Sequence, residues 1–315
     1  MKIAIMESLG ISDEALRGYM APFEAEGHTF AVFEKTTDTG KLVEEACDAD
    51  AMILANMPMP SAVIEKCPDL KFIDVAFTGV DHVGLDAAKA QGIKVSNASG
   101  YSNEAVPELA VGMALSILRN MREVEARCRA GETKAGLVGS ELKGKTVGII
   151  GLGNIGTRSA QIFHIFGTTI LATSRTIHKN VKDYVNQVPL DQLLKESDIV
   201  VLHCPLTAET RGLINKEKLA LMKPSAILLN LARGPVVVSA DLAEALKNGT
   251  IAAAGIDVFD VEPPLPADEP LLDAPNTLLA PHVAFATKES MILRADIVFD
   301  NLRAFLDGHQ KNIIL

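Results

Sequence analysis

The sequence has few cysteines and no close pairs among them. Its 315 residues include Cys47, Cys67, Cys128 and Cys204, none of them in Cys-x-x-Cys spacing. This scatter argues against both a disulfide framework and a zinc site. We interpret the four as reduced, buried thiols, which predicts a cytoplasmic protein without a bound metal.

Long hydrophobic runs and an excess of positive charge are also lacking. No apolar run reaches the roughly 20 residues of a membrane-spanning helix, and the apolar start at residues 1–7 is too short for a signal peptide. Lysine and arginine number 30 against 40 acidic residues, a net charge of −10. The chain is therefore not expected to bind nucleic acid or a membrane. A hydrophobic fraction of 48% is sufficient for the cores of two domains.

The most informative segment is a glycine motif at residues 145–176. A β-branched, apolar run at 146–150 predicts a buried strand, and a second run at 169–172 predicts another. Between them lie a G-x-G-x-x-G sequence and apolar residues at helical spacing. The motif alone is weak, but in a strand–helix–strand unit it predicts a dinucleotide-binding site rather than an ordinary glycine turn.

Each glycine of this motif has a distinct physical role. Gly151 permits a tight turn, Gly153 lets the backbone approach a pyrophosphate, and Gly156 lets the helix pack closely on the strand. The N–H groups at the start of the helix, at Asn154 and Ile155, would hold the anion together with the helix dipole.

The end of the second strand indicates which dinucleotide is bound. An Asp or Glu here would bind the ribose hydroxyls of NAD. The sequence instead has Ser174, Arg175 and Thr176, and Arg175 can pair bidentately with a 2′-phosphate. His178 and Lys179 add possible positive charge. We expect NADP(H), with NAD(H) as the alternative if Arg175 is only a solvated surface residue.

Strand and helix signals also alternate through residues 1–98, at the short spacing of an α/β domain. This half lacks a phosphate loop, so we assign it to the substrate. Ligands of open α/β sheets lie beyond the carboxyl ends of strands. Backbone N–H groups there could hold a carboxylate, although an ordinary glycine turn is equally compatible. The candidate residues at predicted strand ends are Asn56, Met57, Thr78, Gly79 and Val80.

Two long helices define the domain boundaries. A helix from residue 103 to about 129 is predicted to bridge two domains, and a final helix at about 287–306 is long enough to return to the first. The predicted substrate domain is therefore discontinuous, residues 1–98 plus about 287–315. Residues 99–286 form the predicted dinucleotide-binding domain.

Three further motifs follow predicted strands of the second half: Asn-Leu-Ala-Arg-Gly at 230–234, Asp-Val-Phe-Asp-Val-Glu-Pro at 257–263 and Ala-Pro-His-Val-Ala-Phe at 280–285. With Thr-Gly-Val-Asp at 78–81 and His-Cys-Pro-Leu-Thr at 203–207, they make the sequence resemble the D-2-hydroxyacid dehydrogenase family over essentially the whole chain. An Arg, a Glu and a His in this order behind the glycine motif make the resemblance specific.

The resemblance implies that Arg233, Glu262 and His282 are catalytic, and their chemistry fits reduction of a 2-keto acid. Arg233 offers a fork of donors for carboxylate and ketone oxygens, and His282 is a natural proton donor near neutral pH. Glu262 can hold the second ring nitrogen and favour the protonated ring. Each residue alone would more often be a surface or structural residue. Formate dehydrogenases of the same superfamily pair the histidine with glutamine, so Glu262 favours a true keto acid.

The resemblance also implies further cofactor and substrate positions. Asp257 matches a position near the nicotinamide amide. Tyr101 and Phe285 resemble pocket residues of the D-lactate dehydrogenase branch, expected to line the substrate pocket with Met57, and core packing is their alternative. The cofactor positions are His203, Cys204, Pro205, Thr210, Leu231, Ala232, Arg233, Asp257, His282 and Ala284.

These inferences predict an α/β protein of two domains, a Rossmann doubly wound parallel sheet and a flavodoxin-like substrate domain, with the active site in the cleft. The expected activity is NAD(P)H-dependent reduction of a 2-keto acid to a D-2-hydroxy acid. The family implies a homodimer built on the cofactor domains. The main alternative is a dinucleotide-sensing binding protein like the family's corepressors; oxidation of formate or phosphite is disfavoured by Glu262. Lactate-like, glyoxylate or hydroxypyruvate, and branched or aromatic substrates all stay open.

Overall fold

The structure is a computed structural model that describes residues 1–176 and 181–315. It divides into two compact units. Unit 1 comprises Met1–Ser102 and Ala286–Leu315, and unit 2 comprises Asn103–Phe285. His178 and Lys179, named above as possible positive charge, lie outside the described residues.

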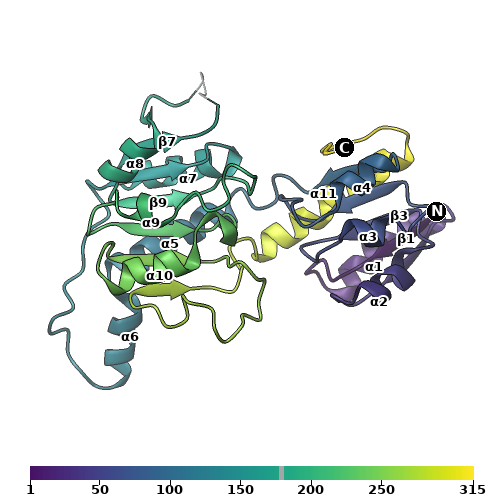
Figure 1. Cartoon of the computed structure of the whole chain (residues 1–315). Helices are drawn as coiled ribbons and strands as arrows, with labels where there is room; N and C mark the ends of the chain where they lie inside the picture. Colours follow the sequence, from purple (N-terminus) through teal and green to yellow (C-terminus); the bar gives the residue numbers. More distant parts are fainter. Residues whose placement is uncertain (177–180) are drawn as a thin grey trace. The chain divides into compact units, whose positions relative to one another are not determined.

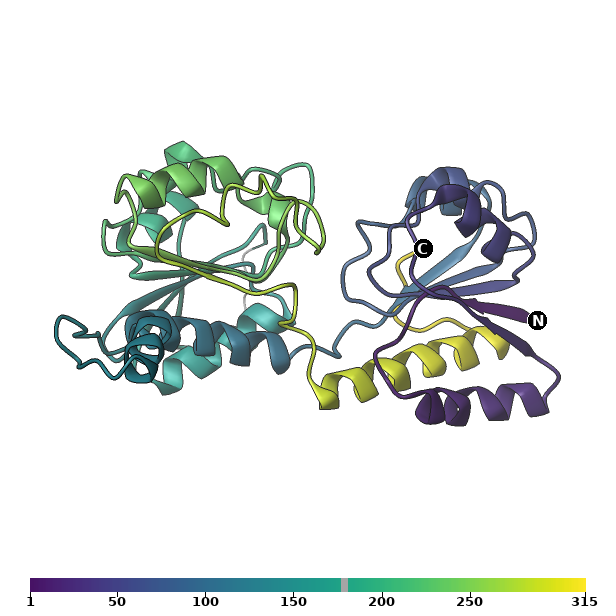
Figure 2. The same ribbon diagram turned by 90° about the horizontal axis from the view of Figure 1, so that it is seen from below.

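Unit 1, all of whose residues are described, is built on a five-stranded parallel sheet with the order β2-β1-β3-β4-β5. This is the flavodoxin-like order, as the sequence predicted. Helices α1 and α11 cover one face and α2, α3 and α4 the other (Figure 1 and Figure 2). The strands are β1 (Lys2–Ile5), β2 (Thr29–Val32), β3 (Ala51–Leu54), β4 (Phe72–Val75) and β5 (Lys94–Asn97). The helices are α1 (Asp13–Ala25), α2 (Thr39–Ala46), α3 (Ser61–Ile64), α4 (Leu85–Ala90) and α11 (Lys288–Leu306).

Helix α11 closes unit 1 from the carboxyl-terminal end of the chain. It begins at a capping box in which the Thr287 hydroxyl accepts the Ser290 N–H, which satisfies backbone donors at the helix start. Its Phe299 ring stacks on Tyr19 of α1 at 4.9 Å between centroids. This aromatic contact joins the two helices over one face of the sheet.

A buried polar network ties α11 to the sheet. Asp74 in β4 is fully buried and accepts a hydrogen bond from Asn301 Nδ2 at 3.0 Å. Burial raises the pKa of Asp74 well above its ordinary value. Asn301 Nδ2 also donates to the Asn97 carbonyl at 3.0 Å, and Asn97 Nδ2 donates to the Thr78 carbonyl at 2.7 Å. The loop after β4 is therefore held through α11.

Unit 2, within its described residues, has a seven-stranded parallel sheet with the order β12-β11-β10-β9-β6-β7-β8. Its core order is that of a Rossmann sheet, as predicted. Helices α5 and α7 pack on one face and α8, α9 and α10 on the other (Figure 2). The strands are β6 (Thr146–Ile150), β7 (Thr169–Thr173), β8 (Val185–Gln187), β9 (Ile199–Leu202), β10 (Ile227–Asn230), β11 (Ala253–Ile256) and β12 (Thr277–Leu279). The helices are α5 (Ala105–Leu118), α6 (Met121–Arg129), α7 (Asn154–Ile165), α8 (Leu190–Glu196), α9 (Lys216–Leu219), α10 (Ser239–Lys247) and a 3-10 turn at Gly234–Val236.

The single helix predicted from residue 103 to about 129 was wrong. The chain forms α5 and then α6, because Asn120 between them has a left-handed φ of 51° that ends the first helix. In α6, whose residues are all described, none is buried. It is stabilised locally by ion pairs four residues apart, Arg127 with Glu123 at 2.9 Å among them. Within the described chain, no helix is long and apolar enough to cross a membrane.

Candidate functional site

The predicted cofactor and catalytic residues of unit 2 gather at one edge of its sheet. Because the strands are parallel, their carboxyl ends meet at the same edge. The sheet order reverses at β6, between β7 and β9, which is where open α/β sheets bind ligands. The segments that follow these strands are Gly151–Gly156 after β6, Ser174–Thr176 after β7, His203–Thr210 after β9, Leu231–Arg233 after β10, Asp257–Glu262 after β11 and Ala280–Ala284 after β12.

The glycine turn after β6 fits a pyrophosphate. Gly151 has a φ of 100°, and a Cβ there would lie 2.6 Å from the Cys204 nitrogen. A Cβ at Gly156 would lie 1.9 Å from the Gly151 carbonyl oxygen, so both positions require glycine. At Gly153, the residue before α7, a Cβ would meet no described atom within 4 Å. The backbone is therefore open to an anion at the start of α7.

His203 ties the glycine-motif helix to the strand beside it. Its Nε2 lies 2.7 Å from the hydroxyl of Ser159 in α7. Burial lowers the pKa of His203 to about 3, so the ring is neutral at physiological pH. The following loop is held by Thr210, whose hydroxyl donates to the Pro205 carbonyl at 2.6 Å. The side chain of His203 thus makes an internal contact, while its backbone packs against Gly151.

Arg175 lies at the surface beside the loop after β9. Its side chain is exposed, and the neighbouring Ser174 hydroxyl donates to the Thr176 carbonyl at 2.6 Å. The pKa of Glu209 is lowered, chiefly because the Thr207 hydroxyl donates to it and in part by the charge of Arg175. Arg175 therefore follows the end of β7, at the carboxyl edge of the sheet, with an exposed side chain.

His282 and Glu262 form a close pair. The ring nitrogen Nδ1 lies 2.8 Å from each carboxylate oxygen of Glu262. A carboxylate only accepts, so Nδ1 carries the donated proton and the tautomer is fixed. The side chain of His282 is 9% exposed and that of Glu262 41%. The ring of Phe285 packs edge-on against the imidazole at 5.3 Å between centroids.

The backbone of His282 is held in an unusual conformation by Asp257. His282 has a φ of 57°, in the left-handed region. The buried carboxylate of Asp257 accepts the N–H groups of Val283 and Ala284 at 2.8 and 2.9 Å, and its carbonyl accepts the His282 N–H at 2.8 Å. Burial raises the pKa of Asp257. The sequence predicted Asp257 near the nicotinamide; in the structure both carboxylate oxygens hold the histidine turn.

Arg233 is positioned by Asn230, the first residue of the 230–234 motif, for which the sequence predicted no role. Asn230, 1% exposed at the end of β10, donates from Nδ2 to the Arg233 carbonyl and accepts the Ala232 N–H. Arg233 Nη1 donates to the Ala232 carbonyl at 2.8 Å. A Cβ at Gly234 would lie 1.9 Å from the Phe259 carbonyl carbon, so this turn packs directly on the segment that leads to Glu262. An Asn directly after a buried strand run was the available signal.

In unit 1, a buried carboxylate shapes the loop after β3. Glu7 Oε1 accepts the N–H groups of Ala55 and Met57 at 2.8 and 2.7 Å. These bonds bracket Asn56, whose side chain accepts from Lys35 at 3.0 Å. The side chain of Met57 is fully buried. The predicted contribution of Met57 to a substrate pocket stays a prediction.

The other candidate substrate residues of unit 1 follow β4 and β5. Thr78, Gly79 and Val80 are partly exposed after β4. Tyr101 is 3% exposed, and its ring lies 6.0 Å from that of Phe77 between centroids. These segments share the carboxyl edge of the unit 1 sheet with Glu7 and Asn56. The sheet order reverses between β1 and β3, so this edge is also the expected ligand position of its fold.

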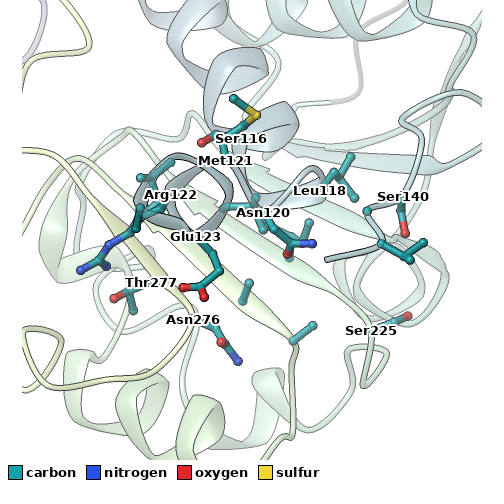
Figure 3. A pocket seen from close by; sticks show the side chains of 18 residues that line it. Ser116, Leu118, Asn120, Met121, Arg122, Glu123, Ser140, Ser225, Asn276 and Thr277 are labelled. Atoms are coloured by element: carbon teal, nitrogen blue, oxygen red, sulfur yellow. The ribbon is translucent and has the colours of Figure 1, made fainter. Parts of the chain in front are cut away.

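A cavity of about 810 Å³ lies at the opposite edge of the unit 2 sheet, away from the candidate site. It is lined by the turn between α5 and α6, the loop before β6 and the amino ends of β10, β11 and β12 (Figure 3). Arg122 and Glu123 of α6 project over it. The described residues include no group of three or more His, Cys, Asp or Glu side chains that could hold a metal ion.

A Rossmann sheet with a glycine turn at its switch point and a His–Glu pair at the same edge is typical of nicotinamide-dependent dehydrogenases. The family model "D-isomer specific 2-hydroxyacid dehydrogenase, NAD binding domain" matches residues 111–284. The chain is also 37% identical over 297 residues to a hydroxypyruvate reductase of Blautia hydrogenotrophica, covering 90% of this chain and 91% of that protein. The chain therefore belongs to the D-isomer-specific 2-hydroxyacid dehydrogenase family and is an oxidoreductase.

Solved structures agree with this assignment. An acyclic imino acid reductase, Bsp5, in complex with NADPH and D-Arg superposes with a TM-score of 0.91 at 27% identity, covering 100% of both chains. A D-lactate dehydrogenase of Aquifex aeolicus complexed with NAD and lactic acid has a TM-score of 0.88 at 27% identity, covering 98% of this chain and 96% of that one. The two differ in the cofactor they contain, so likeness of fold does not choose between NADP and NAD.

Replacing Asp257 by Asn is expected to disturb the histidine turn. A carboxamide would place an NH₂ donor against one of the two N–H groups that now require an acceptor. We expect kcat/KM for a 2-keto acid to fall about 100-fold, the scale of a 1 Å misplacement. Initial-rate kinetics measure this, with exposed Asp260→Asn as the matched control. An Asp257→Asn enzyme as active as the control would show that the turn does not depend on this carboxylate.

Proposed function

We propose that this protein is an NADPH-preferring reductase that converts a small 2-keto acid to the D-2-hydroxy acid. The observation that carries the proposal is the placement of His282 Nδ1 at 2.8 Å from both oxygens of Glu262. The pair lies at the sheet edge that also bears the glycine turn and Arg233. A histidine oriented in this way is suited to deliver a proton from Nε2.

The residues have separate roles in the proposed reaction. The nicotinamide, when bound, supplies the hydride. Arg233 binds the substrate carboxylate and polarises the ketone oxygen with its planar fork of donors. His282 donates the proton to the developing alkoxide, and Glu262 orients the ring. Backbone N–H groups at Thr78, Gly79 and Val80 of unit 1 contribute to carboxylate binding.

The cofactor preference rests on the end of β7. The position that would carry an acidic residue for NAD holds Ser174, and exposed Arg175 follows it. A guanidinium favours the 2′-phosphate of NADPH, whereas a carboxylate there would repel it. Relatives named hydroxypyruvate reductase and glyoxylate reductase support a small substrate such as hydroxypyruvate or glyoxylate. Glu262 supports a keto acid over formate or phosphite.

The proposal is tested by initial rates of NADPH and NADH oxidation against glyoxylate, hydroxypyruvate, pyruvate, 2-ketoisocaproate and phenylpyruvate. We expect turnover that is fastest with NADPH and the small acids. His282→Asn should reduce kcat by roughly 10²–10⁴-fold, the range of general acid catalysis, and exposed His309→Asn should not. Failure to reduce any 2-keto acid, with cofactor binding retained, would overturn the proposal and favour a dinucleotide-sensing protein.

Arg175→Ala tests the cofactor assignment. Loss of charge-assisted hydrogen bonds to the 2′-phosphate costs about 1.5–3 kcal/mol, so the KM for NADPH should rise about 10- to 100-fold. The KM for NADH should change little, because that cofactor lacks the phosphate. Arg17→Ala, an exposed arginine of unit 1, is the control. Equal KM values for NADPH in the Arg175 variant and the control would contradict the contact.

We also propose that the protein is a homodimer formed through unit 2. The support is α6, which has no buried residue among those described, and the apolar side chains near it, Met121 and Val138, which are 49% and 91% exposed. The cavity beside α6 would receive part of the second copy.

Light scattering should give twice the 33.6 kDa of the chain. Met121→Glu should shift the mass towards the monomer, whereas Ile292→Glu in unit 1 should not; a monomeric wild-type protein would refute this assembly.

A further inference from the structure

Two opposite charges are buried at the carboxyl edge of unit 1. Glu7, just after β1, is 4% exposed, and Arg294, in the second turn of α11, is 3% exposed. Burying a charge is costly unless it is paired and hydrogen-bonded. Apolar residues would fill the same space more cheaply, so these charges have a role other than filling the core. Their location is the switch point of the sheet, between β1 and β3.

Arg294 connects the loop after β1 with Tyr101. Its Nη2 donates to the Leu9 carbonyl at 2.5 Å. Its guanidinium carbon lies 5.7 Å from the centroid of the Tyr101 ring, and the guanidinium also hydrogen-bonds with Tyr101. Burial lowers the pKa of Arg294, and Tyr101 and the Glu7 carboxylate oppose that change. The side chain of Arg294 therefore contacts Leu9 and Tyr101, and the nearby carboxylate of Glu7 favours its positive charge.

The surroundings leave Arg294 little freedom. The adjacent loop residue Gly10 has a φ of 71°, and a Cβ there would lie 3.1 Å from Arg294 Nη2 and 2.9 Å from Met291 Sδ. The Tyr101 ring is confined on another side by Phe77. A ring held by both neighbours, with its hydroxyl tied to a planar cation, cannot turn aside without breaking buried hydrogen bonds.

We propose that Arg294 is a specificity-determining positioning residue, which fixes Tyr101 as a rigid wall so that the enzyme favours 2-keto acids with small side chains. The inference rests on the proposed function and on the expectation, from the family resemblance, that Tyr101 lines the substrate pocket. A hydrophobic pocket discriminates between side chains by only about 10- to 200-fold per methylene group. An immobile wall excludes bulky substrates because it cannot yield to them.

The test compares kcat/KM for glyoxylate with that for phenylpyruvate. Arg294→Met keeps an unbranched apolar stem but removes the guanidinium and so releases the tyrosine, and should lower the ratio of glyoxylate to phenylpyruvate about tenfold or more. Tyr101→Phe, which removes only the hydroxyl, should lower the ratio in the same direction. The double variant should show no more than the larger single effect, because both changes break one contact.

Arg303→Met is the matched control. Arg303 is on the same helix, lies 4.2 Å from the centroid of the Phe23 ring and pairs with Glu26 at 2.6 Å. Its loss should affect thermal stability but not the substrate ratio. If Arg294→Met fails to fold, Arg294→Lys, which keeps the charge and loses the fork, gives the same readout with a smaller shift.

An unchanged ratio in the folded Arg294 variant, with only a lower Tm, would overturn the inference and leave Arg294 a purely structural residue. Additive effects in the double variant would also overturn it, since Arg294 would then not act through Tyr101. A wild-type protein that reduces none of the five 2-keto acids of the panel would refute the proposed function itself, which distinguishes the two failures.

Discussion

The candidate site depends above all on the hydrogen bonds of Asp257. Its backbone N–H donates to the Asn230 carbonyl at the end of β10, and its carbonyl and carboxylate hold residues 282–284 after β12. One buried residue at the end of β11 thereby fixes the turns on both sides of it. The left-handed backbone of His282 persists because these bonds surround it. The pairing with Glu262 follows from that turn.

In unit 1, buried polar contacts also position the loops at the edge of the sheet, and these contacts come from one helix, α11. Arg294 and Asn301 lie about two turns apart and so share a face of α11. Arg294 reaches the loop after β1 and Tyr101, whereas Asn301 reaches Asp74 and the end of β5. The last helix of the chain therefore aligns several loops at the carboxyl edge of this sheet. Helix α11, near the end of the sequence, thus holds loops that begin as early as residue 9.

The kinds of element and the fold of both units could be predicted from the sequence. The glycine turn, the strand runs and the family motifs predicted both sheets, because apolar periodicity and glycine spacing are local signals. The break at Asn120 was missed since helical periodicity continues across it. The short edge strand β8 has a mostly polar sequence and gave no signal. The contacts of Asn230, Asp257 and Arg294 were missed because burial of a polar side chain depends on tertiary packing.

The buried acid of β4 makes the stability of unit 1 depend on pH. In the unfolded chain Asp74 ionises near its ordinary value of 3.8, whereas burial keeps it protonated to much higher pH in the fold. Its contribution to stability is therefore complete in acid and declines as the pH rises towards the folded pKa. Reduction of a keto acid consumes a proton and oxidation of the hydroxy acid releases one. Low pH therefore favours both the folded state of unit 1 and the reductive reaction. Alkaline conditions, which favour oxidation, lower the stability of the domain that we assign to the substrate.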